Sequence, residues 1–172
     1  MSEPRVVVRR AMMQDLALFK RLWLAYLEEQ HDKGDLTLPN EHNLAIYCEM
    51  FRAYVSGDVL GLVLFLNVDG KDIGIHMEGE ILGGFELSIG RHTLLQGVYL
   101  EPEYRGRSLT HHLYAKAMEW THAKGLTGGV TSMLTGDDRV PAVLEKVVDG
   151  KFGSSDTKPF MVLVYWQFEK PS

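Results

Sequence analysis

The spacing of apolar residues along the N-terminal third of the chain predicts two amphipathic helices. In residues 13–30 bulky apolar side chains recur every three or four positions, and the same spacing returns in residues 44–55. Apolar residues at that period form one buried face of a helix, so these side chains are expected in the core. A short apolar run at residues 5–10 precedes the helices and is typical of a strand. Gly57 is expected to end the second helix.

From residue 59 onward the pattern changes to that of strands. The dipeptide Asp69-Gly70 lies between two apolar runs and predicts a hairpin. Two further helices are predicted, over residues 107–124 and over residues 137–148. Gly125 is expected to end the first of them. The predicted strands of this part cover residues 59–68, 71–78, 80–89, 92–101, 128–134 and 158–168.

This order of elements predicts one domain of the α/β class (mixed α+β), residues 1–172. The strand–helix–strand segment 92–134 is expected to form a right-handed crossover between parallel neighbours. The remaining strands can pair as an antiparallel meander. The result is a central mixed sheet of six to seven strands, mostly antiparallel, with about four helices. The closing strand is long and aromatic, and at an unprotected sheet edge it would favour a homodimer.

Composition and charge narrow the classes of partner. The 172 residues carry a net charge of −5, and the basic ones form no long run, so no nucleic-acid partner is expected. No apolar run reaches the roughly 20 residues of a membrane span, so no membrane partner is expected. A single cysteine, Cys48, and an N-terminus without a secretory core predict a cytoplasmic protein. The histidines lack ligand spacing, so no metal site is predicted.

The basic loop "YRGRSLT", residues 104–110, is the strongest candidate for chemistry. It follows a predicted strand and opens a predicted helix. The first turn of a helix has unpartnered N–H groups and a dipole that favours negative charge, so such a junction is a ready anion site. Gly106 permits close backbone approach, and two arginines add positive charge. A basic loop capped by Ser108, without any ligand, is the alternative that local chemistry leaves open.

The stretch "VYLEPEYRGRSLTHHLYAKAMEW", residues 98–120, resembles the acetyl-coenzyme A signature of the GNAT superfamily of N-acetyltransferases. In that signature two alternating apolar residues precede Pro-x-x-Arg-Gly-x-Gly-x-Gly/Ala and a helix. Ser108 and Thr110 stand where the two later glycines are usual. The order of elements over residues 4–168 also resembles the GNAT fold.

The resemblance implies a role for the loop and for the strand before it. Backbone amides of the loop would hold the pyrophosphate of acetyl-CoA, the cosubstrate. The strand would pair with pantetheine, and the amide of Val98 would stabilise the oxyanion formed at the thioester. Gly97 would suit a bulge in this strand, and relief of packing beside Tyr99 is the alternative that stays open. The cofactor-binding residues so implied are Val98, Leu100, Arg105, Gly106, Arg107, Ser108, Leu109 and Thr110.

Acetyl transfer also requires a base for the amine and a proton for the departing thiolate. Glu86 is the preferred base among the strand candidates, which include His92 and Glu101, although a solvent-facing Glu86 is the simpler interpretation. Many GNAT members supply the proton from a fourth-helix tyrosine, but here Leu144 occupies that position. Tyr114 and Tyr99 are possible substitutes, and Tyr114 is the predicted one.

These expectations leave two functions open. The first is direct transfer of an acetyl group from acetyl-CoA to a primary amine of unknown identity. In the GNAT fold the acceptor groove involves the first two helices, so specificity is expected in the loop 31–42 and the hairpin 69–80. The second is a catalytically inactive GNAT-fold protein that acts as a binding or structural subunit, which the replaced glycines and the missing tyrosine favour.

Overall fold

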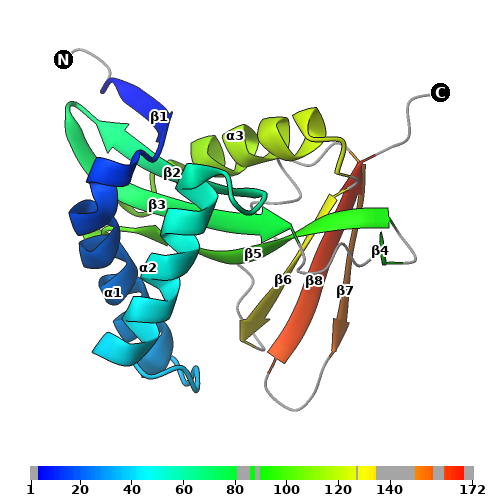
Figure 1. The fold of residues 1–172 in the computed structure, drawn as a ribbon, viewed down its shortest axis with the longest axis horizontal. Helices are drawn as coiled ribbons and strands as arrows, with labels where there is room; N and C mark the ends of the chain where they lie inside the picture. The colour runs from blue at the N-terminus through cyan, green and yellow to red at the C-terminus, as the bar shows by residue number, and fades with distance from the viewer. Residues whose placement is uncertain are drawn as a thin grey trace.

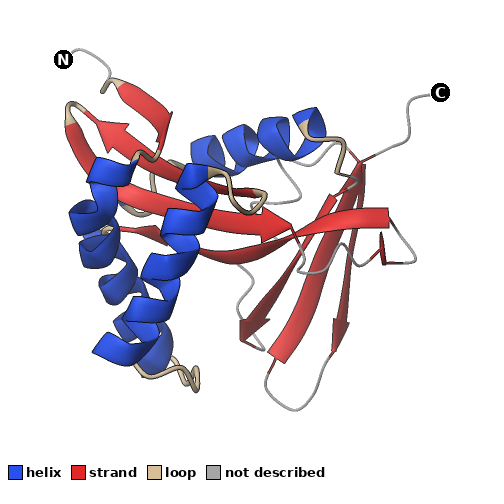
Figure 2. Ribbon diagram, in the orientation of Figure 1, coloured by secondary structure: helices blue, strands red, loops and turns tan. Residues whose placement is uncertain are grey.

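The structure is a computed structural model that describes residues 4–80, 86–87, 90–126, 128–134, 150–156 and 161–168. Three α-helices lie against a large mixed sheet (Figures 1 and 2). They are α1 (Leu16–Asp32), α2 (Glu41–Ser56) and α3 (Thr110–Ala123), and two short 3-10 turns, η1 (Met13–Asp15) and η2 (Pro102–Tyr104), accompany them. No helix among these residues is long and apolar enough to cross a membrane.

The sheet has seven strands in the order β1-β2-β3-β5-β6-β8-β7, and a short strand, β4, pairs with β5 beside this path. Only β5 and β6 are parallel, and the other neighbours are antiparallel. The strands are β1 (Val6–Arg10), β2 (Gly61–Val68), β3 (Lys71–Glu80), β4 (Glu86–Leu87), β5 (Gly90–Leu100), β6 (Gly128–Leu134), β7 (Gly150–Asp156) and β8 (Met161–Phe168).

Apolar residues on both faces of the sheet explain how the helices dock. Phe65, Ile75 and Tyr99 point to the face that α1 and α2 cover, where Phe19 and Phe51 meet them in one fully buried cluster. Leu64, Leu66 and Leu100 point to the other face, which α3 covers through residues such as Leu113. The predicted stripes of the first two helices are therefore confirmed as core. Burial on both faces also explains the near-continuous apolar run of β2.

Local sequence sets the limits of the helices. Asn40 caps α2, because its side-chain oxygen accepts a hydrogen bond of 2.9 Å from the amide of Asn43. Gly57 ends α2 at a positive φ of 85°. Asp15, which precedes α1, makes no side-chain cap hydrogen bond to the helix. Its carboxylate instead pairs with Arg9 of β1 at 2.8 Å.

The structure differs from the predicted fold in three places. Seven strands follow one path and β4 lies beside it, so the described strands exceed the six to seven expected. Three α-helices are described against the four expected, and the predicted helix over residues 137–148 lies outside the described residues. The closing strand β8 is not at the edge, since β6 pairs with it on one side and β7 on the other. The edge-strand reason for expecting a homodimer is therefore wrong.

Candidate active site

The parallel strands β5 and β6 part after three residue pairs. His92, Thr93 and Leu94 pair with Gly128, Gly129 and Val130. Beyond this point β6 continues beside β8 and β5 continues beside β3. Figure 1 shows the two strands spreading away from each other. Among the described residues, none pairs with β5 from Gln96 to Leu100 on the side away from β3.

A β-bulge lies where this unpaired edge begins. Met77 of β3 pairs with Gly97, whereas its neighbour Glu78 pairs with Leu95, so Gln96 is an extra residue on β5. A bulge bends its strand and increases the local twist, which helps to turn β5 away from β6. The bulge expected at Gly97 is thus one residue earlier, and Gly97 follows it directly.

Strand geometry fixes which backbone groups of β5 face the unpaired edge. The amide of Glu101 donates to the carbonyl of Ile73 in β3, over 2.9 Å. Backbone groups of successive residues in an antiparallel strand alternate in direction. The N–H and C=O groups of Val98 and Leu100 therefore point away from β3. Consistent with this, the carbonyl of Leu100 accepts a hydrogen bond of 2.9 Å from Nε of Arg105 rather than from a strand.

The turn before α3 retains a glycine-like backbone where the sequence has serine. Gly106 has φ of 75° and Ser108 has φ of 56°, so both are left-handed. A Cβ added at Gly106 would meet nothing within 4 Å, which shows open space above the turn. In the described part of the chain, no hydrogen bond occupies the amides from Gly106 to Thr110. These groups and the start of α3 form a concave set of donors suited to an anion.

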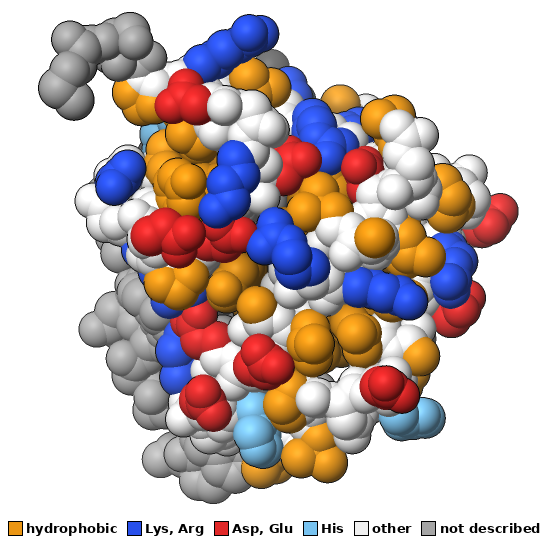
Figure 3. Space-filling model, turned by 90° about the vertical axis from the view of Figure 1, so that its left-hand side faces the viewer, with side chains coloured by type: hydrophobic (Ala, Val, Ile, Leu, Met, Phe, Trp, Pro, Cys, Tyr) orange, Lys and Arg blue, Asp and Glu red, His pale blue; other side chains and the backbone are white. Residues whose placement is uncertain are grey.

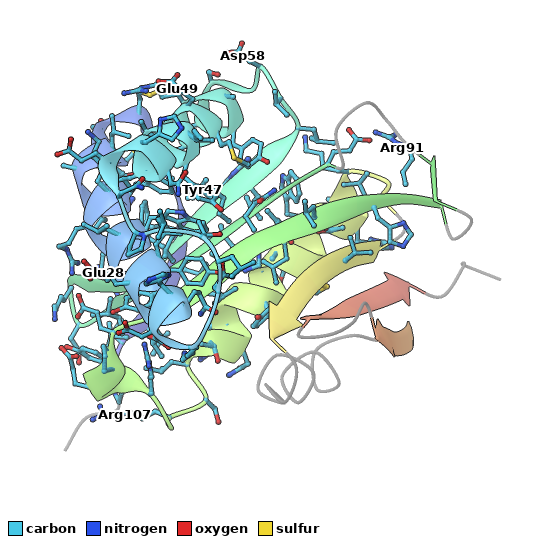
Figure 4. All side chains as sticks on the ribbon, turned by 90° about the horizontal axis from the view of Figure 1, so that it is seen from below. Glu28, Tyr47, Glu49, Asp58, Arg91 and Arg107 are labelled. Carbon is cyan, nitrogen blue, oxygen red and sulfur yellow. The ribbon has the colours of Figure 1, made fainter. Side chains whose placement is uncertain are left out.

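The two arginines of this turn have different surroundings. Arg105 forms an ion pair with Glu29 of α1, and its guanidinium lies 5.5 Å from the ring centroid of Tyr99. Burial raises the pKa of Glu29, but hydrogen bonds from Lys33 and Arg105 bring it below the usual value. Arg105 therefore fixes the turn to α1 and β5. Arg107 is exposed at the turn, with no carboxylate partner among the described residues (Figure 4).

The preferred base, Glu86, belongs to β4, and its side chain lies outside the described residues. Its backbone pairs with Arg91, which precedes Gln96 by five residues, or about 16 Å at the strand rise of 3.3 Å per residue. His92 is fully buried. Glu101 is also buried, and it forms ion pairs with Arg21 at 2.5 Å and Lys71 at 2.6 Å. Both ion pairs engage the Glu101 carboxylate, so that residue is a poor base.

The predicted acid, Tyr114, lies on the face of the sheet that α3 covers. It is 3% exposed, and its ring meets that of His76 edge-on, with centroids 5.7 Å apart. Its catalytic role stays a prediction. His76 belongs to a buried polar group that the sequence reasoning missed. Nε2 of His76 lies 3.2 Å from a carboxylate oxygen of Glu78, and the hydroxyl of Thr121 in α3 lies 2.8 Å from the other oxygen.

On the opposite face, two tyrosines reach the bulge, and the sequence reasoning gave neither of them a role. Tyr26 of α1 donates its hydroxyl to the carbonyl of Gln96 over 3.3 Å. Tyr54 of α2 lies close to the side chain of Gln96: burial raises the pKa of this tyrosine, and the Gln96 side chain lowers it. The sequence pattern predicts only that tyrosines on amphipathic helices are buried in the core. No local signal distinguishes a core aromatic residue from one that contacts a functional strand.

The two segments expected to set specificity are far apart. The loop between α1 and α2 and the β2–β3 hairpin turn lie at opposite ends of α1 (Figure 1). The α1 face of the molecule carries acidic and basic side chains interspersed among apolar ones (Figure 3). Among the described residues in this view, the basic side chains form no continuous surface.

Comparisons with known proteins agree with this geometry. The family model described as the acetyltransferase (GNAT) family matches residues 15–143. The fold is similar to that of yncA from Salmonella typhimurium, solved with its cofactor acetyl-CoA, with a TM-score of 0.70 and 13% identity over 97% of this chain and 96% of the other. No curated protein matches the chain.

Two further solved structures share the fold. A GNAT family acetyltransferase from Brucella melitensis, in complex with acetyl-CoA, gives a TM-score of 0.63 and 17% identity over 98% of this chain and 91% of the other. The PaiA N-acetyltransferase from Thermoplasma acidophilum, in complex with coenzyme A, gives a TM-score of 0.63 and 14% identity over 92% of this chain and 98% of the other. The family match spans most of the sequence, and the chain belongs to the GNAT family of acetyltransferases.

Proposed function

We propose that this protein is an acetyl-CoA-dependent N-acetyltransferase that passes the acetyl group directly to a primary amine. The observation that carries the proposal is the parting of β5 from β6 after Leu94 and Val130, next to the left-handed turn that opens α3. An unpaired strand edge offers backbone groups to an extended ligand, and the turn offers amides to an anion. Acetyl-CoA would match both, because its pantetheine arm is an extended chain and its pyrophosphate is an anion.

The residues of the turn fit the pyrophosphate. Open space above Gly106 and the left-handed φ of Ser108 support a backbone cradle in which serine replaces glycine without changing the chain path. The amides of residues 106–110 would bind the phosphate oxygens, and Arg107 would add a positive charge. Leu109 is buried in the core beneath α3 and anchors the turn, while Thr110 is the first residue of the helix.

The strand edge would hold the reactive end of the ligand. Bound acetyl-CoA would supply an activated acetyl thioester. Val98 and Leu100, whose backbone groups face away from β3, would pair with the pantetheine arm. The amide of Val98, two residues after Gln96, would donate to the thioester oxygen and stabilise negative charge there. Removing one such donor typically costs about 10²–10³ in kcat in other enzymes, so this is a large part of the expected catalysis.

The acceptor would be a primary amine that loses a proton before or during attack. Glu86 stays a prediction for the base, but its backbone pairs with Arg91, about 16 Å along β5 from Gln96, which is farther than one ordered water bridges. Similarity to a protein named as an N-acetyltransferase supports an amine acceptor.

The test is release of the thiol of CoA from acetyl-CoA in the presence of a panel of primary amines. We expect thiol release that depends on the amine, and its loss in Gly106→Trp, because an indole at that position would fill the cradle. A protein that binds acetyl-CoA but releases no thiol with any amine would contradict the proposal and support the catalytically inactive binding subunit.

A further inference from the structure

Tyr26 is packed directly against the bulge of β5. Its hydroxyl donates to the carbonyl of Gln96, and its ring covers Gly97. A Cβ added to Gly97 would lie 2.5 Å from Cζ of Tyr26 and 2.7 Å from its hydroxyl oxygen. Contacts that short never occur, so the absence of a side chain at residue 97 is what allows this phenol to reach the strand.

The second tyrosine, Tyr54, holds the bulge from the neighbouring helix. Its ring lies over Gly61 and Gly79, which pair with each other across β2 and β3. A Cβ at Gly61 would lie 2.1 Å from the ring, and one at Gly79 would lie 2.2 Å from the hydroxyl. Tyr54 is buried and lies close to the side chain of Gln96. It therefore positions the bulge, whereas Tyr26 is only partly buried and contacts the backbone next to Val98.

Resting on the proposed function, we propose that the hydroxyl of Tyr26 relays the proton to the departing sulfur. Tyr26 of α1 would thereby supply the proton for which Leu144, at the position of the tyrosine usual in the GNAT motif, has no donor. Tyr114 is a weaker candidate, because it is buried on the other face of the sheet beside His76.

In the acetyl transfer from sulfur to the amine, each bond and proton is accounted for within the site. As the bond from the amine nitrogen to the acetyl carbon forms, the bond from that carbon to sulfur breaks, and its electron pair passes to sulfur. Tyr26 gives its hydroxyl proton to sulfur and takes one from the amine nitrogen. Burial raises the pKa of Tyr26. A phenol of that kind does not persist as the anion, so it serves as a relay rather than as a one-way acid.

Equilibrium binding tests the contact without any turnover. At pH 9 the thiol of free CoA is partly ionised, since the pKa of an alkyl thiol lies at or somewhat above the value of about 8.5 for cysteine, and a hydroxyl donor in the site favours the thiolate further. A hydrogen bond to a charged acceptor favours binding by about tenfold or more. We therefore expect the preference for CoA over desulfo-CoA to fall about tenfold in Tyr26→Phe. Tyr47 of α2 (Figure 4) packs against Trp23, as Tyr26 does, and Tyr47→Phe should leave the preference unchanged.

Kinetics supply the second measurement. Tyr26→Phe should lower kcat about 100-fold, the ordinary contribution of a positioned proton donor, with the Kd for acetyl-CoA unchanged. An unaltered preference for CoA in a folded Tyr26→Phe variant would overturn the inference while leaving the proposed function intact. A wild-type protein that binds neither CoA nor desulfo-CoA would overturn the proposed function itself.

Discussion

Ser108 adopts a left-handed backbone conformation in which glycine is normally favoured. That conformation costs a residue with a Cβ about 1 kcal/mol or more. The sequence pattern alone shows a missing glycine, whereas the backbone shows that the glycine conformation has been kept. The replacement therefore does not by itself indicate a lost site.

Substitutions at Ser108 test this interpretation. Ser108→Gly should bind acetyl-CoA as tightly as the wild type or up to about fivefold more tightly, since the strain is relieved. Ser108→Val should bind at least tenfold more weakly, because a β-branched residue resists positive φ. Calorimetric titration measures both. Equal affinity in the Gly and Val variants would contradict a role for this conformation.

Glu101 stabilises the junction of α1, β3 and β5 through its two ion pairs. Burial raises the pKa of Glu101, but the hydrogen bonds from Lys71 and Arg21 lower it by more. The pKa therefore lies below the usual value. A carboxylate of this kind contributes stability above its unfolded pKa, about 4.3 for glutamate, and loses it as the pH falls through the lower folded pKa.

The corresponding prediction concerns the free energy of unfolding. Glu101→Gln should lower it by about 1 kcal/mol at pH 7, because both basic partners are half exposed. The difference from wild type should be smaller at pH 3 than at pH 7, because a larger fraction of the wild-type carboxyl is protonated at the lower pH. Urea unfolding at the two pH values measures it, with Glu103→Gln of the same turn as the matched control. A pH-independent difference would contradict the ion-pair account.

At the scale of elements, β2 and β3 pack against α2 through paired glycines. Gly61 and Gly79 leave room for the ring of Tyr54, which then reaches the bulge. The positions of these glycines in the sequence predict only weakened strands. The reason for glycine at both positions is the ring of Tyr54, which comes from a helix that precedes them in the chain.

Gly61→Ala should therefore lower the free energy of unfolding by about 2 kcal/mol, through overpacking against Tyr54. The same substitution in a Tyr54→Ala background should cost much less, because the ring it meets is gone. Denaturant unfolding of the four proteins of this cycle measures the coupling. An equal cost in both backgrounds would show that strand propensity, rather than the ring, requires glycine.

Periodicity predicted most elements, because bulky stripes at helical spacing and long apolar runs are strong local signals. Strand β7, "GKFGSSD", carries no such signal, since glycine, serine and aspartate have low strand propensity. Its pairing with β8, from Gly150 opposite Phe168 to Asp156 opposite Val162, gives it strand structure. The sequence reasoning missed it for that reason, and with it the interior position of β8.

At the scale of the whole molecule, the candidate site joins segments that are distant in the chain. The turn 105–110 could be predicted from its own residues. The contact of Tyr26 with Gln96 spans 70 positions and follows only from the docking of α1 on the sheet. Likewise Glu29 of α1 pairs with Arg105, which ties the helix to the turn. Contacts of this kind leave no local pattern, so the sequence predicts the anion site better than the chemistry beside it.

The central claim is that acetyl-CoA binds along β5 and in the turn before α3. Calorimetric titration of the wild-type protein and of Gly106→Trp with acetyl-CoA tests it most directly. We predict one site of micromolar affinity in the wild type and no detectable binding in the variant, whose fold is checked by circular dichroism. A wild-type protein that does not bind at millimolar acetyl-CoA, or a folded Gly106→Trp variant that binds as tightly, would contradict it.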